Sequence, residues 1–461
     1  MFPSNLRLLR AAFLFSLFLI LSNCGSAAPP VSIPAPTVAN ITVTPDGSGS
    51  VYVVGEAGAV EGGAEVTIEV QDGTSSIIPW QQILSSTAYA SQFCDTAESD
   101  GSFACSITAD AGDILCIRQT TSAGTSASCG SITVPDDAFA HKLSQIIDVY
   151  VDEENNRSYL LGKDLSDQYT LKVFSNTGTS LESTFDLVSI INDSTMELTS
   201  ATAKDDVILV TDYANNKLHK INRSASALTS SQGSQCTNAS LKYVRIDSPG
   251  ASGADPTDYL LLCAGTDFVE LIKYLISTAY PTESDQVSNI DVDSILGLAT
   301  FGNEGWFVYV GATDGTMELV MFEDTQLING STNSVPAQYR AFSAGQVVGA
   351  SAVKRPLGIR ISDSIPGYFD SNFGFNELTL PDSVLAVDIV CGDRSSCTDL
   401  YMLGTDGVVY KYSPAQSAAA SSSVSTQAID PARLVIDESA GKLMVIDDAG
   451  QAIFWISLSD F

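Results

Sequence analysis

Residues 207–222 read Val207-Ile-Leu-Val-Thr-Asp-Tyr-Ala-Asn-Asn-Lys-Leu-His-Lys-Ile-Asn222. An apolar run at 207–210 ends at Thr211-Asp212, a polar turn follows, and a second, alternating run occupies 217–222. Period-two alternation on both sides of a polar segment predicts a strand, a tight turn and a second strand. Asp and Asn favour such a turn because they tolerate a left-handed backbone and their side chains bond nearby backbone groups.

The same strand–Asp–strand unit returns through the C-terminal two-thirds of the chain, with its weakest copy at 357–363. The aspartates that mark the copies are Asp164, Asp212, Asp267, Asp314, Asp363, Asp406 and Asp447. Successive markers lie 41 to 55 residues apart, and short strands repeated at such a period are typical of a β-propeller. Seven markers predict seven blades over residues 136–461. The alternative is one or two large β-sandwiches with hairpins that are regular by chance.

The repeated unit resembles the strand–Asp–Asn–strand centre of an NHL-type β-propeller blade. The resemblance implies an all-β ring with broad faces that bind a protein, a peptide or a glycan. Streptogramin-lyase-like and gluconolactonase-like propellers are enzymes instead, and they use His or a Glu/Asn/Asp metal site in the central channel. Carboxylates are plentiful here, so a Ca²⁺-dependent lactonase or lyase is the alternative function. Nothing in the sequence marks which carboxylates would converge.

The chain is strongly acidic. It has 22 basic and 54 acidic residues, which give a net charge of −32 at pH 7. A surface of this sign repels phosphate backbones, so we expect no nucleic-acid partner. The charge keeps the protein soluble, and it also suits a divalent cation or a basic partner.

Residues 1–23 predict an export signal. Arg7 and Arg10 precede an apolar run at 11–21, which is too short for a comfortable bilayer span. The run ends in Leu21-Ser-Asn-Cys24, which resembles the lipobox of bacterial lipoproteins, although Asn23 departs from the usual Gly, Ala or Ser. The resemblance implies cleavage before Cys24 and acylation of that residue. Ordinary secretion without lipidation is the alternative.

Gly25 is not the aspartate that retains enterobacterial lipoproteins at the inner membrane, so the same resemblance implies an outer-membrane location. Residues 24–39 contain four prolines among small residues. Such a segment favours extended conformations and has no core, so we expect a tether between the membrane and the folded part.

Residues 40–135 are rich in short apolar runs and turn signals such as Asp46-Gly47 and Asp72-Gly73. We expect strands at 41–44, 51–54, 64–70, 102–107, 113–119 and 131–134. The segments 62–68, 100–107 and 111–115 resemble bacterial immunoglobulin-like domains of surface proteins. The resemblance implies a β-sandwich that serves as a spacer or, in some members, as an adhesion module.

The chain has nine cysteines, and lipidation of Cys24 leaves an even number, which in an exported protein predicts disulfides. Spacing favours the pair across the turn at 391–397 most. The four expected pairs are Cys94–Cys105, Cys116–Cys129, Cys236–Cys263 and Cys391–Cys397. There is no CxxC motif and histidine is nearly absent, so we expect these cysteines to hold no metal.

The two histidines, His141 and His219, have neither a nucleophile nor a metal-ligand cluster near them in sequence. No GxSxG, Walker or Rossmann fingerprint occurs. We therefore expect surface or packing roles for both histidines, no catalytic residue and no cofactor. The acidic segment 152–156 could bind Ca²⁺, although a solvated loop joining the first two strands of a blade fits it better.

Two further segments have a less regular composition. The aromatic residues at 368–375 suit core packing, with a binding patch as the alternative. The Ser- and Ala-rich residues 417–425 predict a loop between the sixth and seventh blades.

Closure of the ring needs an extra strand. The last repeat offers strands at 433–437, 442–447 and 451–458, one fewer than a complete blade, and an open ring would leave an edge unpaired. We expect residues 137–143 to pair beside 451–458. The sequence thus predicts an all-β chain, an immunoglobulin-like sandwich followed by a seven-bladed propeller, with the first domain fixed at the seam between the first and last blades.

Overall fold

The structure is a computed structural model. It describes residues 32–461 except 48, 72–90, 234–235, 237–239, 247–257, 276–280, 289, 291, 301–304, 313, 315, 324–327, 336, 346–354, 371–373, 393–396 and 414–416. Almost every element is a strand. The helical elements are η1 (Val38–Asn40), α2 (Leu187–Ile191) and η2 (Leu458–Asp460). Within these residues, no helix has the length and apolar character needed to cross a membrane.

The first part of the chain forms a compact β unit, here called the N-terminal unit. Its strands are β1 (Ile41–Pro45), β2 (Ser50–Gly55), β3 (Glu65–Gln71), β4 (Ser91–Thr96), β5 (Phe103–Thr108), β6 (Ile114–Thr121), β7 (Gly124–Thr125) and β8 (Gly130–Thr133). One sheet has the order β1-β2-β5. The other has the order β4-β3-β6-β7, with β8 also paired to β6. All six strands expected from the sequence are present. The sequence missed β4, which pairs with β3, and the two-residue β7.

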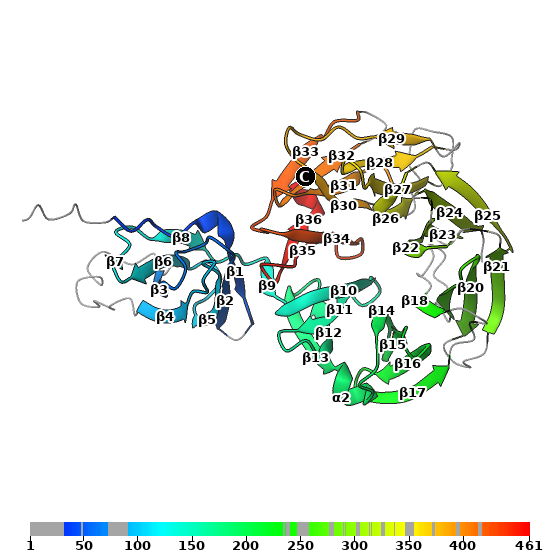
Figure 1. Cartoon of the computed structure of the whole chain (residues 1–461), viewed down its shortest axis with the longest axis horizontal. Helices are drawn as coiled ribbons and strands as arrows, with labels where there is room; N and C mark the ends of the chain where they lie inside the picture. Colours follow the sequence, from blue (N-terminus) through cyan, green and yellow to red (C-terminus); the bar gives the residue numbers. More distant parts are fainter. Residues whose placement is uncertain are drawn as a thin grey trace, which may run out of the picture.

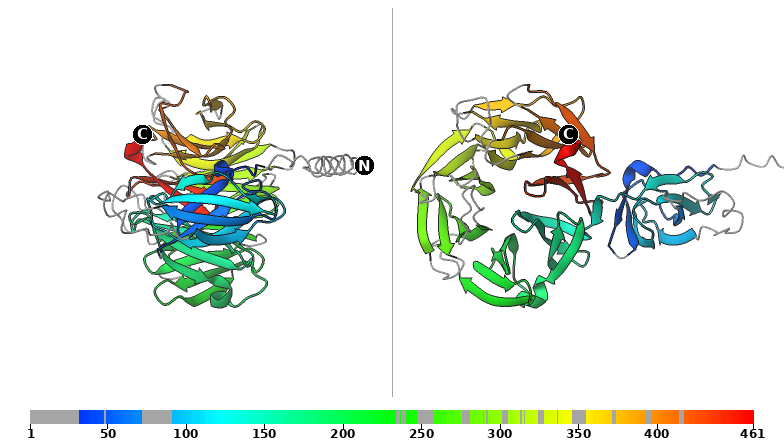
Figure 2. Two further views of the ribbon diagram at one scale, coloured as in Figure 1. Left: turned by 90° about the vertical axis from the view of Figure 1, so that its left-hand side faces the viewer. Right: turned by 180° about the vertical axis from the view of Figure 1, so that it is seen from behind.

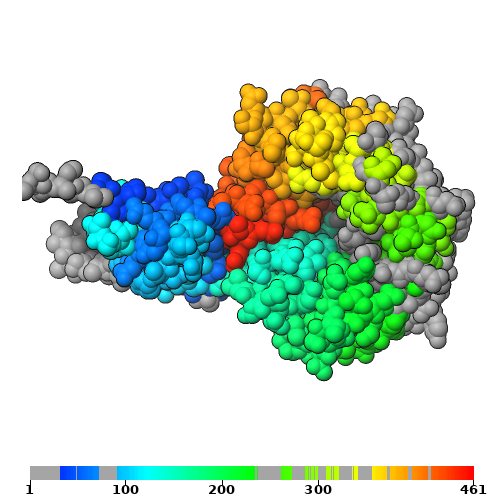
Figure 3. All heavy atoms as spheres, viewed as in Figure 1, coloured from blue at the N-terminus to red at the C-terminus, as the bar shows by residue number. Residues whose placement is uncertain are grey.

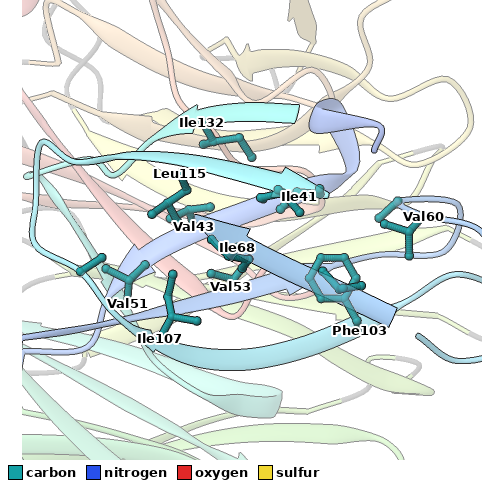
Figure 4. Close-up of a cluster of buried hydrophobic side chains, with 14 of the residues drawn as sticks. Ile41, Val43, Val51, Val53, Val60, Ile68, Phe103, Ile107, Leu115 and Ile132 are labelled. Atoms are coloured by element: carbon teal, nitrogen blue, oxygen red, sulfur yellow. The ribbon is translucent and has the colours of Figure 1, made fainter. Parts of the chain in front are cut away.

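A single hydrophobic core lies between these two sheets (Figure 4). Alternate residues of each strand enter it, such as Val51 and Val53 of β2 and Val66 and Ile68 of β3, all fully buried. Period-two alternation places one side of each strand in the core and leaves the other for solvent or a neighbour. The turn at Asp46-Gly47 joins β1 to β2, and Gly47 has the positive φ of +84° that this turn uses.

The remaining strands form seven antiparallel sheets of four strands each. The first three consist of β10 (Leu143–Asp152), β11 (Arg157–Asp164), β12 (Tyr169–Ser175) and β13 (Ser180–Asp186); β14 (Leu198–Lys204), β15 (Val207–Asp212), β16 (Lys217–Asn222) and β17 (Ala227–Gly233); and β18 (Ser240–Ile246), β19 (Asp258–Ala264), β20 (Phe268–Leu275) and β21 (Pro281–Ser288).

The next three consist of β22 (Ser294–Thr300), β23 (Gly305–Gly311), β24 (Met317–Glu323) and β25 (Ile328–Val335); β26 (Tyr339–Gly345), β27 (Arg355–Arg360), β28 (Ile365–Phe369) and β29 (Phe375–Glu377); and β30 (Ala386–Cys391), β31 (Leu400–Gly404), β32 (Val408–Tyr412) and β33 (Ser422–Ser425). The last combines β34 (Pro431–Asp437), β35 (Lys442–Asp447) and β36 (Ala452–Ser457) with β9 (Ala138–Ala140).

The sheets follow one another around a ring, with the first strand of each sheet nearest the centre (Figure 1). This arrangement is a β-propeller. Every marker aspartate lies at the end of the second strand of its sheet or in the turn that leads to the third. The 207–222 hairpin is β15 and β16, in the expected register. The weakest copy, at 357–363, lies at β27 and its following turn, so the period holds even where the sequence pattern is poor.

One sequence prediction is wrong. Residues 417–425 were expected to form a loop, but residues 422–425 are strand β33, which pairs with β32 as the outer strand of its sheet. An outer strand has one sheet neighbour and a solvated face, so it can form from serines that lack the apolar alternation of an inner strand. Its pattern alternates exposed and half-buried residues.

Candidate functional site

The ring closes where its first and last sheets meet. Strand β9 precedes the first sheet but pairs with β36 of the last, with Phe139 opposite Ile453. The backbone N–H of Trp455 donates to the carbonyl of Asp137, which extends the pairing. The predicted closure is therefore confirmed for residues 137–142, whereas Leu143 already begins β10 of the first sheet. Because the chain passes directly from the N-terminal unit into this strand, the unit is attached at the seam (Figures 1 and 2).

Apolar and polar contacts both hold the seam. Phe139 and Phe174 meet edge to face, with ring centroids 5.7 Å apart, inside a cluster that draws on the first and last sheets. A buried polar chain runs beside it. The Ser158 hydroxyl donates to Asn176 Oδ1 over 2.8 Å, and Asn176 Nδ2 donates to Asp437 Oδ2 over 2.7 Å. Each of these polar groups has a hydrogen-bond partner, which offsets the cost of burying it, so the network can hold the first sheet against the last.

His141 lies in this seam and is completely buried. Its Nδ1 accepts the N–H of Leu143 over 3.0 Å, so Nε2 carries the proton and donates to the carbonyl of Asp447 over 3.0 Å. The pKa of His141 is lowered to about 3, mainly by burial and to a smaller extent by the nearby Lys172, against the raising effect of the hydrogen bond to the Asp447 carbonyl. The expected packing role is correct, with the neutral imidazole joining two backbone segments.

The N-terminal unit rests on the seam through the outer face of sheet β1-β2-β5. Thr42, Thr44, Tyr52 and Val54 are buried there, whereas the outward residues of β5 are exposed. Tyr52 and Val54 pack with Ala140 of β9. Lys142 forms an ion pair with Asp46 at 3.1 Å, and its Nζ lies 4.8 Å from the centroid of the Tyr52 ring. The unit and the ring therefore share a packed interface rather than a bare linker.

Carboxylates gather on one side of this interface. Asp447 is fully buried and accepts the backbone N–H groups of Ile429, Asp430 and Gly450. Burial raises the pKa of Glu56, and the charges of Asp447 and Asp430 raise it further. Burial also raises the pKa of Asp447 itself, against those three hydrogen bonds. Burial and mutual repulsion therefore both favour the protonated forms of Glu56 and Asp447.

A groove of 470 Å³ opens between the N-terminal unit and the ring. One wall comes from residues 38–41 and 131–133, and the other from 426–429, the connection between β33 and β34. Gln427 Nε2 donates across it to the carbonyl of Thr133 over a long 3.4 Å. Figure 3 shows the N-terminal unit (blue) meeting the ring at the last sheet (red). The described residues of the walls are aliphatic or uncharged polar, and none of them carries an ionisable side chain.

The inner strands bear two carboxylates that bridge neighbouring sheets. Asp148 of β10 accepts from the Ser200 hydroxyl and from the N–H of Ala201, both in β14. Asp388 of β30 accepts the N–H of Leu434 in β34 over 2.8 Å. Both therefore tie one sheet to the next. Among the described residues, no group of three or more His, Cys, Asp or Glu side chains is placed to hold a metal ion.

The acidic segment 152–156 forms the turn between β10 and β11, as expected of the joining loop. Asp152 is buried, and its carboxylate accepts the backbone N–H and the side-chain amide of Asn155. The carboxylate oxygens that could face a cation thus stabilise the turn. Aromatic residues at 368–375 also serve packing: Phe369 is fully buried against Tyr339 and Phe375. Phe373 lies outside the described residues.

The structure contains the four disulfides that the spacing favours: Cys94–Cys105, Cys116–Cys129, Cys236–Cys263 and Cys391–Cys397. The first links β4 to β5 and so joins the two sheets of the N-terminal unit. The last crosses the turn between β30 and β31. Cys24 and the other residues up to 31, where a signal and a tether were predicted, lie outside the described residues.

His219 has neighbours that the sequence did not reveal. It is 1% exposed, its Nδ1 lies 2.7 Å from the hydroxyl of Ser231, and its Nε2 lies 3.3 Å from Asp212 Oδ2. Ser231 stands twelve residues downstream, directly opposite His219 in the pairing of β16 with β17. His219 is buried, as a packing role requires, but its hydroxyl neighbour lies too far away in the sequence for spacing to have indicated it. Only the register of the outer strand could have shown it, and β17 has too weak a pattern to fix that register.

No family model and no curated protein matches the chain in sequence. Two solved structures resemble it at 7% identity. Hydrazine synthase of Kuenenia stuttgartiensis has a TM-score of 0.48 and covers 68% of this chain and 96% of its own. The Cps50 (Swd1) beta-propeller domain of Myceliophteria thermophila has a TM-score of 0.45, with 68% and 97% covered.

Proposed function

We propose that the protein is a lipoprotein of the cell envelope, anchored to the outer membrane, whose propeller binds or scaffolds a protein or peptide partner. In this proposal each four-stranded sheet is one of seven blades, and the N-terminal unit is an immunoglobulin-like spacer. The observation that carries the proposal is where that unit sits. It lies beside the ring, so the described residues of the unit cover neither face of the propeller (Figures 1 and 2).

One face of the ring is rich in acid. In an antiparallel sheet, the turn from the second to the third strand and the connection to the next sheet lie at the same end. The marker aspartates therefore share one face. The exposed acidic residues of these turns and connections include Asp267, Asp314, Asp363 and Asp406 of the markers, with Glu197, Asp293, Asp382 and Asp430. This charge favours a partner with a basic surface, because complementary charge speeds and orients association.

The cysteines support a location in the cell envelope. Four disulfides suit an oxidising compartment, and they leave Cys24 as the one cysteine of the sequence without a disulfide role. Several acyl chains on one residue give stable anchorage, where one chain alone is marginal. The lipobox-like Leu21-Ser-Asn-Cys24 remains the basis for the anchor.

The experiment replaces Cys24 with Ser in the full-length protein and separates membrane from soluble envelope fractions. Wild type should sediment with outer membranes and incorporate labelled palmitate, whereas the variant should do neither. Ser422→Cys, an added cysteine far from the signal, is the control that should leave anchorage unchanged. Palmitate incorporation by Cys24→Ser would show that the proposed anchor is wrong.

The partner is tested by crosslinking on intact cells, followed by purification under denaturing conditions. We expect one principal envelope protein, lost at high salt and lost when Asp267, Asp314, Asp363 and Asp406 are all changed to Asn. Recovery that is insensitive to both salt and these changes would contradict binding through the acidic face.

A further inference from the structure

We propose that Ser231 is an activated nucleophile, with His219 as its general base and Asp212 as the group that orients the imidazole. The three side chains form a continuous chain of contacts, Ser231 Oγ to His219 Nδ1 at 2.7 Å and His219 Nε2 to Asp212 Oδ2 at 3.3 Å. The first distance lies within the range for a nucleophile and its base, and the second is slightly longer. An ester that presents its acyl carbon to an open strand edge is the substrate class that fits. This activity goes beyond the proposed binding role.

The hydrogen-bond pattern assigns the protons. Asp212 Oδ1 accepts the N–H groups of Glu197 and Asn215, and Oδ2 accepts the side-chain amide of Asn215 over 2.7 Å. Burial raises the pKa of Asp212, but the hydrogen bonds from His219, Asn215 and Glu197 outweigh it and hold the pKa below its usual value. The carboxylate is thus an acceptor only, so His219 Nε2 carries a proton and Nδ1 is free to accept the Ser231 hydroxyl proton.

Access distinguishes the three residues. Asp212 and His219 are buried, whereas Ser231 is exposed on β17. This strand is the outermost of its sheet, and in the described chain no strand pairs with its outer edge. An edge strand presents unpaired backbone N–H groups, which are the donors that stabilise an oxyanion in acyl transfer. A substrate can therefore reach the hydroxyl while the base stays shielded from water.

The step balances without a cofactor. Ser231 Oγ attacks the acyl carbon as its proton passes to His219 Nδ1, and the resulting imidazolium is stabilised by the charge of Asp212. The carbon–oxygen bond to the alcohol breaks, and the alcohol leaves with the proton from Nδ1. Water then attacks the acyl-serine with the same base, which releases the acid and restores the hydroxyl.

The sixth sheet contains a similar contact to a turn aspartate that has only a structural role. There the Tyr410 hydroxyl donates to Asp406 Oδ2 over 2.6 Å, so a third-strand side chain again bonds the turn aspartate. In the described contacts, Tyr410 forms no hydrogen bond to a serine of the outer strand. Tyr410 therefore provides a matched control for turn bracing, and Ser230, the neighbour of Ser231 on β17, provides one for serine reactivity.

The test incubates the full-length protein with a fluorophosphonate probe and locates the adduct by mass spectrometry. We expect labelling at Ser231 that is abolished in Ser231→Ala, slowed about 100-fold or more in His219→Gln, and unchanged in Ser230→Ala and Tyr410→Phe.

A second measurement follows release of p-nitrophenol from p-nitrophenyl acetate, which should require Ser231. No labelling of the wild type, labelling that persists in Ser231→Ala, or a His219→Gln variant that reacts at the wild-type rate would each overturn the proposal. Ser231 is exposed, so its alanine variant should fold, and circular dichroism checks this. Should His219→Gln fail to fold, the Ser231→Ala and Ser230→Ala pair still decides the outcome.

Discussion

His141 at the ring seam and His219 on the third strand of the second sheet are both buried, but they have different partners. His141 contacts backbone groups through both ring nitrogens, the carbonyl of Asp447 and the N–H of Leu143. His219 contacts two side chains, one of them a hydroxyl open to solvent. The proton position is the same in both rings. The atom that faces the free nitrogen decides whether the imidazole is a structural clamp or a base.

The seam is the region where loss of packing should cost most. Phe139→Ala removes a buried ring that contacts Phe174 and the last sheet, and such changes cost about 3–5 kcal/mol. We expect a lower thermal midpoint for the propeller and increased hydrogen exchange in β9 and β36. Phe93, which is 63% exposed on β4, gives the control: Phe93→Ala should change the midpoint little. Equal effects of the two changes would contradict ring closure through β9.

The sequence was sufficient to predict this seam because the last repeat lacked one strand and a closed ring must pair its edges. The apolar residues of 138–143 supplied the only candidate nearby. The second and third strands of the sheets were equally predictable, because their alternation or apolar runs indicate burial. The outer strands were not: β17 and β33 consist largely of small polar residues that have one sheet neighbour. The Ser231–His219–Asp212 contacts depend on such a strand, so sequence spacing could not reveal them.

The docking interface was only partly predictable for a related reason. The sequence placed the N-terminal unit at the seam through chain connectivity alone. It did not indicate that Thr42 and Thr44 would be buried, because an alternating strand with threonine on one side ordinarily exposes that side. Nor could it show that Glu56 would lie near Asp447 and Asp430, which are almost four hundred residues away in the chain.

The seam histidine should make stability depend on pH. The pKa of His141 is about 3 in the folded protein and 6.5 in the unfolded chain. Below pH 6.5 the unfolded chain therefore takes up a proton that the folded chain does not. Stability from the neutral imidazole is therefore present above pH 6.5 and falls as the pH decreases. Between pH 7 and pH 5 the loss from this group is about 2 kcal/mol.

His141→Asn isolates that contribution. The variant should be less stable than wild type at pH 7, and its disadvantage should shrink by about 2 kcal/mol at pH 5, measured by denaturant unfolding. The comparison between the two proteins is needed because Glu56 and Asp447 have raised pKa values and so act in the opposite direction as the pH falls. A constant difference across this range would show that His141 is not held neutral by the seam.

The smallest effect is expected at the turn of the sixth sheet, which repeats the aspartate contact of His219 without a nucleophile. Tyr410→Phe removes the hydroxyl that donates to Asp406. Asp406 is exposed and still accepts the N–H of Val408, so water can replace the lost donor and the cost should be about 1 kcal/mol or less. Denaturant unfolding measures the cost, and hydrogen exchange of residues 405–408 locates it. If Tyr410→Phe destabilised the ring as much as Phe139→Ala, contacts at the turn aspartates would contribute as much stability as the pairing that closes the ring. The aspartate contact of His219 would then be explained by stability alone, and only the reactivity of Ser231 would separate the two sheets.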